Sequence, residues 1–119
     1  MKQVMLVTGG SRGIGAATAR LGAARGYAVC INYRQNEAAA RALVQEITGA
    51  GGDAVAVAGD VGSEADVVRL FAEVDRALGP ITALVNNAGI LERQMRVEHM
   101  DAGRLGRVLA TNVIGSFLC

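Results

Sequence analysis

The length and charge of the chain exclude several classes of protein. Its 119 residues suffice for one domain, and 12 basic against 11 acidic residues give a net charge of +1 with no basic run, so we expect neither nucleic-acid nor membrane binding. Apolar residues make up 51% of the chain and aromatic residues 3%, which predicts a core of Val, Leu, Ile and Ala. Cys30 and Cys119 offer no disulfide framework, and neither a signal peptide nor a transmembrane-length run is present, so we expect a cytoplasmic protein.

Short apolar runs alternate regularly with segments of helical period. The runs at 3–8, 28–33, 53–58 and 81–86 are apolar on both faces, as strands covered by helices on each side should be. Helical patterns occupy residues 13–25, 37–49, 63–78 and 101–119, with a looser segment at 89–100 before the last. Asn36 is a predicted N-cap, and Ser63 with Asp66 has the spacing of a capping box. The alternation predicts a Rossmann-type α/β fold, a doubly wound parallel sheet within one domain at 1–119.

A glycine-rich turn, "TGGSRGIG" at residues 8–15, joins the first strand to the first helix. Gly9, Gly13 and Gly15 have the spacing G-x-x-x-G-x-G, and no Gly-Lys-Ser/Thr follows, so the turn is not a P-loop. At this place in a strand–helix unit a pyrophosphate can lie against backbone N–H groups and the positive end of the helix dipole. The alternative is that the glycines only allow the helix to pack closely on the sheet.

Together with "NNAG" at residues 86–89, the glycine turn resembles the signatures of the short-chain dehydrogenase/reductase family. The resemblance covers the whole chain and includes "GDV" at 59–61 and Asn112. It implies that Asp60 and Val61 flank an adenine and that residues 86–89 line the cofactor ribose, although Asp60 taken alone is a common residue in a turn before a helix. The full set of expected cofactor-binding residues is Gly9, Ser11, Arg12, Gly13, Ile14, Gly15, Tyr33, Arg34, Asp60, Val61, Asn86, Asn87, Ala88 and Gly89.

The end of the second strand bears on which nicotinamide cofactor is bound. Proteins that bind NAD usually carry an acidic residue there, which accepts a hydrogen bond from the ribose 2′-hydroxyl, whereas this chain has Tyr33. Arg34 follows, and Arg12 lies in the glycine turn, so two cations can converge on a 2′-phosphate. We therefore expect NADP(H) to be preferred over NAD(H). The alternative is that Arg34 is a solvated charge at a strand end.

The family resemblance implies a catalytic tetrad of Asn, Ser, Tyr and Lys, of which Asn112 is the only candidate here. Asn112 lies on an apolar helical stripe, where its amide needs a partner. Neither Tyr27 nor Tyr33 is followed by Lys four residues later, and Lys2 is the sole lysine. A lone loop histidine, His99, is more often a surface residue than a substitute base. We therefore expect this chain to be the cofactor-binding half of a longer protein, inactive by itself.

Two functions remain open at this point. The first is an NADP(H)-dependent oxidoreductase that transfers hydride between nicotinamide and a carbonyl/alcohol pair, similar to 3-oxoacyl-thioester reductases or sugar dehydrogenases. Its expected partners are a small-molecule substrate and further copies of itself, because the family resemblance suggests a homotetramer. The second is a non-catalytic dinucleotide-binding module, acting as a sensor or an interaction protein. No metal site is expected.

Overall fold

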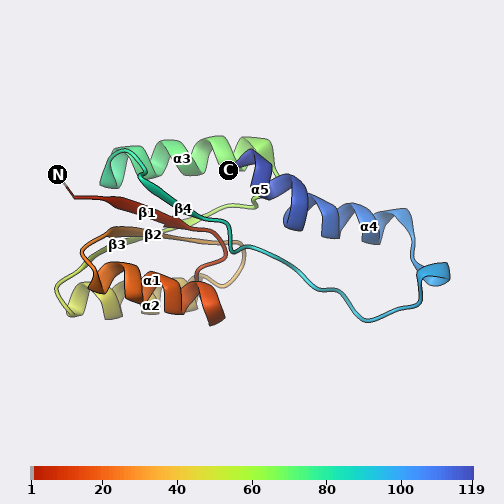
Figure 1. Cartoon of the computed structure of the whole chain (residues 1–119), viewed down its shortest axis with the longest axis horizontal. Coiled ribbons are helices and arrows are strands. Elements are labelled where there is room, and N and C mark those ends of the chain that lie inside the picture. Colours follow the sequence, from red (N-terminus) through yellow and green to blue (C-terminus); the bar gives the residue numbers. More distant parts are fainter. Residues whose placement is uncertain (1) are drawn as a thin grey trace.

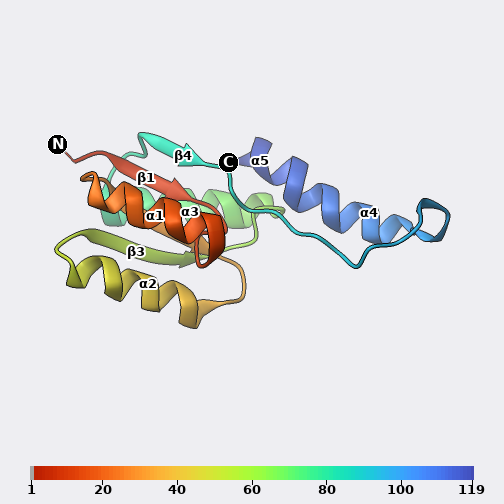
Figure 2. The same cartoon turned by 60° about the horizontal axis from the view of Figure 1, so that its bottom comes forward.

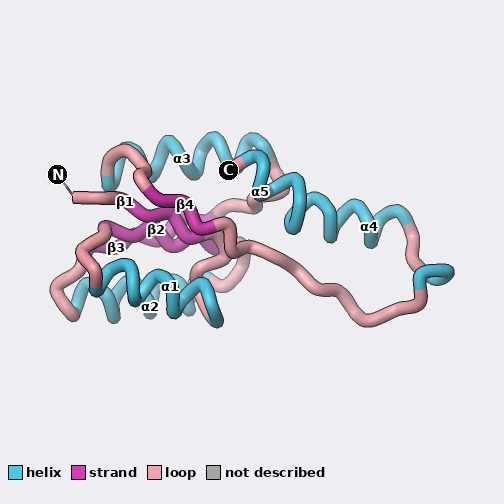
Figure 3. The backbone as a smooth tube through the Cα atoms, viewed as in Figure 1, coloured by secondary structure: helices cyan, strands magenta, loops and turns pink. Residues whose placement is uncertain are grey.

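The structure, a computed structural model that describes residues 2–119, contains a parallel sheet of four strands in the order β3-β2-β1-β4. Its first part follows the predicted alternation (Figures 1 and 3). The elements are β1 (Val4–Val7), α1 (Gly13–Ala24), β2 (Ala28–Tyr33), α2 (Glu37–Gly49), β3 (Asp53–Ala58), α3 (Glu64–Leu78) and β4 (Ala83–Val85). All three strand pairings are parallel, which confirms the predicted fold class. This strand order is that of the first half of a Rossmann-type sheet.

Helices cover the two faces of the sheet unequally. Helices α1 and α2 lie on one face and α3 on the other, as Figure 1 shows. Alternate side chains of the central strands point to opposite faces, so that Val7 and Ile31 pack with α1 and α2, whereas Leu6 and Cys30 pack with Leu70 of α3. Each fully buried branched side chain stabilises the fold by about 1.5–3 kcal/mol. This core fixes the carboxyl ends of the strands.

Side-chain caps set the starts of α2 and α3. Asn36 accepts a hydrogen bond from the Ala39 N–H and Ser63 from the Asp66 N–H, so both predicted N-caps are confirmed. The predicted capping box is only half formed. The Asp66 carboxylate accepts from the backbone N–H of Asp60 at 2.8 Å instead of reaching back to Ser63, because the Ser63 N–H is already bonded to the Asp60 carbonyl.

Beyond β4 the chain leaves the sheet and forms an arm, residues 89–119. An extended segment leads to a 3-10 helix (Val97–His99), then to α4 (Ala102–Leu109), a π-helix (Ala110–Ile114) and α5 (Gly115–Leu118). The helix expected from about Asp101 to the end of the chain is present as these last three consecutive segments, and its middle is a π-helix in which the Gly115 N–H donates to the Ala110 carbonyl, five residues earlier. Figures 1 and 2 show the arm projecting away from the sheet, which gives the molecule a long dimension of 51 Å.

No helix within residues 2–119 combines the length and the apolar character needed to span a bilayer.

Candidate functional site

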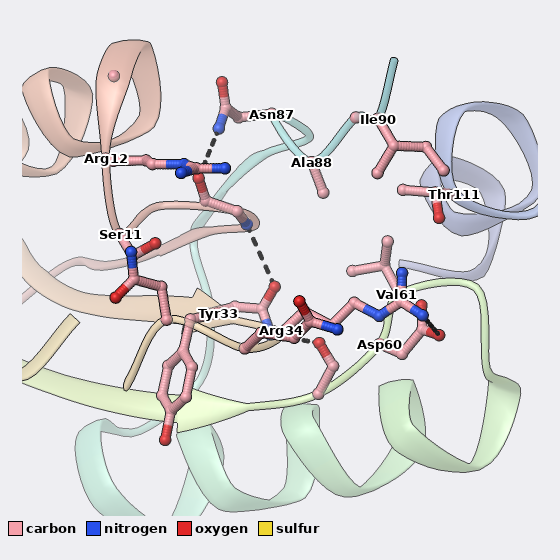
Figure 4. A pocket seen from close by; sticks show the side chains of 17 residues that line it. Ser11, Arg12, Tyr33, Arg34, Asp60, Val61, Asn87, Ala88, Ile90 and Thr111 are labelled. Atoms are coloured by element: carbon pink, nitrogen blue, oxygen red, sulfur yellow. Dashed lines mark hydrogen bonds and ion pairs between the residues drawn. The ribbon is translucent and has the colours of Figure 1, made fainter. Parts of the chain in front are cut away.

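A groove of about 680 Å³ lies over the carboxyl ends of all four strands (Figure 4). Its walls come from the turn after β1, the residues that follow β2 and β3, and the segment after β4. The lining residues are Gly9, Ser11, Arg12, Gly13, Asn32, Tyr33, Arg34, Gln35, Asn36, Gly59, Asp60, Val61, Asn87, Ala88, Gly89, Ile90 and Thr111. Open α/β sheets bind ligands at this edge, so the groove is the candidate site.

Hydrogen bonds join the two sequence signatures to each other at the floor of this groove. The Thr8 hydroxyl oxygen accepts from the backbone N–H groups of Asn87 and Ala88, at 3.1 and 3.0 Å. In return, the Asn87 side-chain amide donates to the carbonyls of Thr8 and Gly9, at 3.0 and 2.9 Å. A Cβ on Gly9, whose φ is +58°, would lie 2.9 Å from the Ala88 Cα, so no other residue fits there. The turn and the strand end therefore form one rigid unit.

Asn32 is a structural residue of the groove that the sequence reasoning missed. It is 2% exposed, and its side-chain oxygen accepts from the Gly9 N–H at 3.2 Å. Its amide nitrogen donates to the carbonyls of Val57 and Gly59, at 3.3 and 3.1 Å. One side chain thus links the ends of three strands. The available signal was a polar residue inside an otherwise apolar strand, where an unpaired amide would cost about 1–3 kcal/mol.

The N-terminus of α1 differs from those of the other long helices. Asn36, Ser63 and Asp101 cap α2, α3 and α4 with their side chains. Within the part of the chain that the structure describes, no side chain caps α1 and its first turn contains no acidic residue. A Cβ on Gly13, at φ +60°, would meet no atom within 4 Å. This helix end therefore presents uncapped N–H groups and an open backbone surface to the groove, which suits an anion.

Three charged side chains line the groove, from Arg12, Arg34 and Asp60. Arg34 and Asp60 form an ion pair of 3.6 Å between Nη2 and Oδ2. Among residues 2–119, Arg12 forms no ion pair. The lining of the groove therefore carries a net charge of +1.

The nearest acidic residue after β2 is already engaged elsewhere. Glu37 accepts hydrogen bonds from Arg41 and from the Tyr33 hydroxyl, which together hold the pKa of Glu37 below its usual value. Tyr33 is buried, and its hydroxyl is directed toward α2. The β2 end therefore presents Arg34 to the groove and no carboxylate.

Four of the expected site residues do not line the groove. Ile14 is exposed to solvent. Gly15 packs inside the turn, where a Cβ would collide with the Asn87 amide nitrogen and lie 2.7 Å from the Gly9 carbonyl oxygen. At position 15, glycine is therefore required because the first helix packs closely on the sheet, which was the alternative to phosphate binding. The Asn86 side-chain amide donates to the Ser116 carbonyl at 3.3 Å, and Asn86 is not among the lining residues.

Asn112, the fourth of these residues, connects the arm to the end of β4. Its side-chain oxygen accepts from the Ile90 N–H at 2.7 Å, and its nitrogen donates to the Ile90 carbonyl at 2.9 Å. This pair supplies the partner that the sequence reasoning required. Asn112 is exposed and lies in the π-helix, whereas its neighbour Thr111 is buried and lines the groove. The Asn112 amide acts here as a positioning group for the groove's far wall.

A doubly wound parallel sheet with a groove over its strand ends places the protein among the Rossmann-type α/β proteins. A family model described as "short chain dehydrogenase" matches residues 3–119, and the chain belongs to that family.

Individual relatives agree with this assignment. The chain is 53% identical over 116 residues to a protein of Escherichia coli (strain K12) named "Uncharacterized oxidoreductase YgfF", a match that covers 98% of this chain and 47% of that one. It is 44% identical over 121 residues to a 3-oxoacyl-[acyl-carrier-protein] reductase of Synechocystis, with coverage of 98% and 47%.

A solved structure is similar as well. The blue fluorescent protein from a metagenomic library, determined in complex with NADPH, superposes with a TM-score of 0.92 at 36% identity, covering 98% of this chain and 47% of that protein. The chain thus spans about half the length of the relatives it matches.

Proposed function

We propose that residues 1–119 form the nucleotide-binding domain of an NADP(H)-dependent oxidoreductase, which transfers hydride between nicotinamide and a carbonyl or alcohol substrate. The observation that carries this proposal is the uncapped N-terminus of α1, which opens onto a cationic groove at the carboxyl edge of the sheet. Membership of the short-chain dehydrogenase family supports the reaction class.

The residues present fit a dinucleotide. The uncapped N–H groups at the start of α1 would hold the pyrophosphate, and the open face of Gly13 leaves room for it. An anion at a helix N-terminus is stabilised by about 0.3–1 kcal/mol, and by up to about 2 kcal/mol when partly buried. Asp60 and Val61 would flank the adenine, and residues 87–89 would line the ribose. When bound, the nicotinamide supplies or accepts the hydride.

The charges favour NADP(H) over NAD(H) in this proposal. Arg12 and Arg34 both line the groove, whereas Glu37 is held by Arg41 and Tyr33 and is not available to a ribose 2′-hydroxyl. Hydrogen bonds to a charged group contribute about 1.5–3 kcal/mol each, which corresponds to tenfold or more in affinity. The similar metagenomic protein was solved with NADPH.

The substrate and the catalytic groups are the next part of the proposal. The resemblance assigns Asn112 to a tetrad whose Tyr-x-x-x-Lys pair is not in the printed sequence, so we expect no dehydrogenase activity from the 119 residues alone. We propose a 3-oxoacyl thioester or a sugar as the substrate of the whole protein, the first supported by the Synechocystis relative. Cytoplasmic location and a homotetramer remain part of the proposal.

Binding affinities of variants test the cofactor assignment. Arg12→Ala and Arg34→Ala should each raise the dissociation constant of NADPH by about tenfold and leave that of NADH within about twofold, because only the 2′-phosphate needs these cations. Calorimetry at fixed salt provides both constants. Arg25→Ala, an exposed arginine at the far end of α1, is the matched control. Equal weakening of both dinucleotides would show that the arginines act structurally.

A non-catalytic sensor or interaction module is the second candidate, because the groove and the uncapped N-terminus of α1 would serve dinucleotide binding alone equally well. Such a module would bind NADPH in the same groove without consuming it. Oxidation of NADPH in the presence of 3-oxoacyl thioesters, followed by absorbance, separates the two functions when the whole coding sequence is expressed.

A further inference from the structure

Building on the proposed function, we propose that Asp60 is a specificity-determining residue. The Asp60 carboxylate forms an ion pair with Arg34 and repels any further negative charge that approaches Arg34. Asp60 therefore limits how strongly the groove prefers a 2′-phosphate over a 2′-hydroxyl.

The turn after β3 fixes the Asp60 carboxylate. Its Oδ1 accepts from the Gly62 N–H at 2.9 Å, and the Asp60 carbonyl accepts from the Ser63 N–H at 3.0 Å. The Asp60 N–H is in turn bonded to Asp66 at 2.8 Å. Three hydrogen bonds therefore hold this residue, and its second oxygen, Oδ2, is the one paired with Arg34. Figure 4 shows Asp60 and Arg34 lying together in the groove.

Arg34 is the more adaptable member of the pair. Its side chain is 55% exposed, compared with 34% for Asp60, and the separation of 3.6 Å makes this a loose ion pair. Exposed pairs of this kind contribute little to stability, so a stronger anion can draw the guanidinium away. A 2′-phosphate would provide one, since it carries more charge than a carboxylate and pairs well with a guanidinium.

Asp60 acts against that exchange in two ways. A 2′-phosphate must compete with the carboxylate for Arg34, and it must also approach a fixed negative charge in the same groove. A 2′-hydroxyl meets neither obstacle. With Arg12 and Arg34 as the lining cations and Asp60 as the lining anion, removing the Asp60 charge raises the net charge of the lining from one to two.

The test is the substitution Asp60→Asn, which keeps Oδ1 as the acceptor for Gly62 and removes only the charge. The preference for NADPH, taken as the ratio of the NADH to the NADPH dissociation constant, should rise by about three- to tenfold, as expected for removal of a screened repulsion. The ratio is the readout because any effect of Asp60 on the adenine is common to both dinucleotides. Asp60→Ser, which retains an acceptor for the same turn, should shift the ratio in the same direction. Asp75→Asn, an exposed residue of α3 outside the groove, controls for net charge.

A double-mutant cycle sharpens the result. If Asp60 neutralises part of the Arg34 charge, Arg34→Ala must weaken NADPH binding more in the Asp60→Asn background than in the parent chain. An unchanged ratio of NADPH to NADH affinity in both Asp60 variants, with a native circular dichroism spectrum, would overturn the proposal, as would a ratio that shifts toward NADH. Failure of the parent chain to bind either dinucleotide would instead contradict the proposed function itself.

Discussion

The sheet region and the arm of this protein are stabilised in different ways. In the sheet region, residues 2–88, the central strands β1 and β2 are almost wholly buried between helices. In the arm, α4 contains no buried residue. Seven large apolar side chains of the arm are at least 45% exposed, namely Leu91, Val97, Leu105, Leu109, Val113, Ile114 and Phe117. The sheet region is held by packing, whereas the arm depends on a few specific links.

Those links all reach the strand ends that form the groove. Asn112 binds the backbone of Ile90, Asn86 binds the Ser116 carbonyl, and Gly115 approaches Val61 so closely that a Cβ would lie 2.7 Å from its Cγ2. The side of the groove formed by the glycine turn thus belongs to the rigid sheet region, and its far wall belongs to a weakly packed helix. We expect substitutions in the first to change stability and binding together, and substitutions in the second to change only local order.

The largest difference in stability between the two regions is expected when a glycine is replaced by alanine in each. Gly15→Ala places a methyl group against Asn87, Gly9 and Gly10 and should destabilise the fold by about 2–3 kcal/mol, with loss of dinucleotide binding. Gly106→Ala in α4 meets no atom within 4 Å and should stabilise the helix by about 0.5–1 kcal/mol. Urea unfolding and calorimetry measure both effects. Similar outcomes for the two alanines would contradict the distinction between the regions.

A smaller contrast concerns hydrogen bonds. Thr8→Val removes the acceptor of the Asn87 and Ala88 N–H groups and should lower the free energy of unfolding by about 2 kcal/mol. Asn112→Ala should leave global stability within about 0.5 kcal/mol, because the exposed amide groups that it frees can bond to water. Hydrogen exchange should then accelerate in residues 89–119 of the Asn112 variant alone. Faster exchange throughout its sheet would show that the arm is part of the cooperative core.

The smallest expected effect is alkaline destabilisation through Cys30. Burial raises the pKa of the Cys30 thiol from 9.0 to about 12, so the folded state keeps a proton that the unfolded state releases. The stabilisation is present in full below pH 9 and is lost as the pH rises toward 12, by about 1.4 kcal/mol at pH 10. Cys30→Ala should remove this part of the pH dependence and Cys119→Ser, in the arm, should retain it. Identical alkaline profiles for parent and Cys30→Ala chains would refute the assignment.

Local rules were enough to predict most of the sheet region from the sequence. The apolar runs marked the strands, and Asn36 and Ser63 marked helix starts, because caps and alternation depend on neighbours within one turn. Asp66 shows the limit of such rules: its spacing predicted a bond to Ser63, but the turn after β3 brought the Asp60 N–H closer. The groove was predicted from the family signatures, and the structure places most of the expected residues around it.

Longer-range relations could not be predicted. The pairing of Arg34 with Asp60 depends on how the ends of β2 and β3 lie beside each other, and spacing along the chain does not encode it. The π-helix accompanies a contact between Asn112 and Ile90, 22 residues apart. Asn86 belongs to the NNAG signature, yet its side chain points to α5, since successive side chains at a strand end alternate in direction.

The bonds between Thr8 and Asn87 also determine when the groove can exist during synthesis. These residues are 79 positions apart, and β1 acquires its second neighbour only when β4 pairs with it. Contacts of such long sequence separation form late in folding because the loop they close must first be ordered. A chain released up to the end of β3 can assemble β1, β2 and β3 around α1 and α2, but the glycine turn still lacks the Asn87 amide that holds it. The complete groove can therefore form only after about three quarters of these 119 residues have left the ribosome.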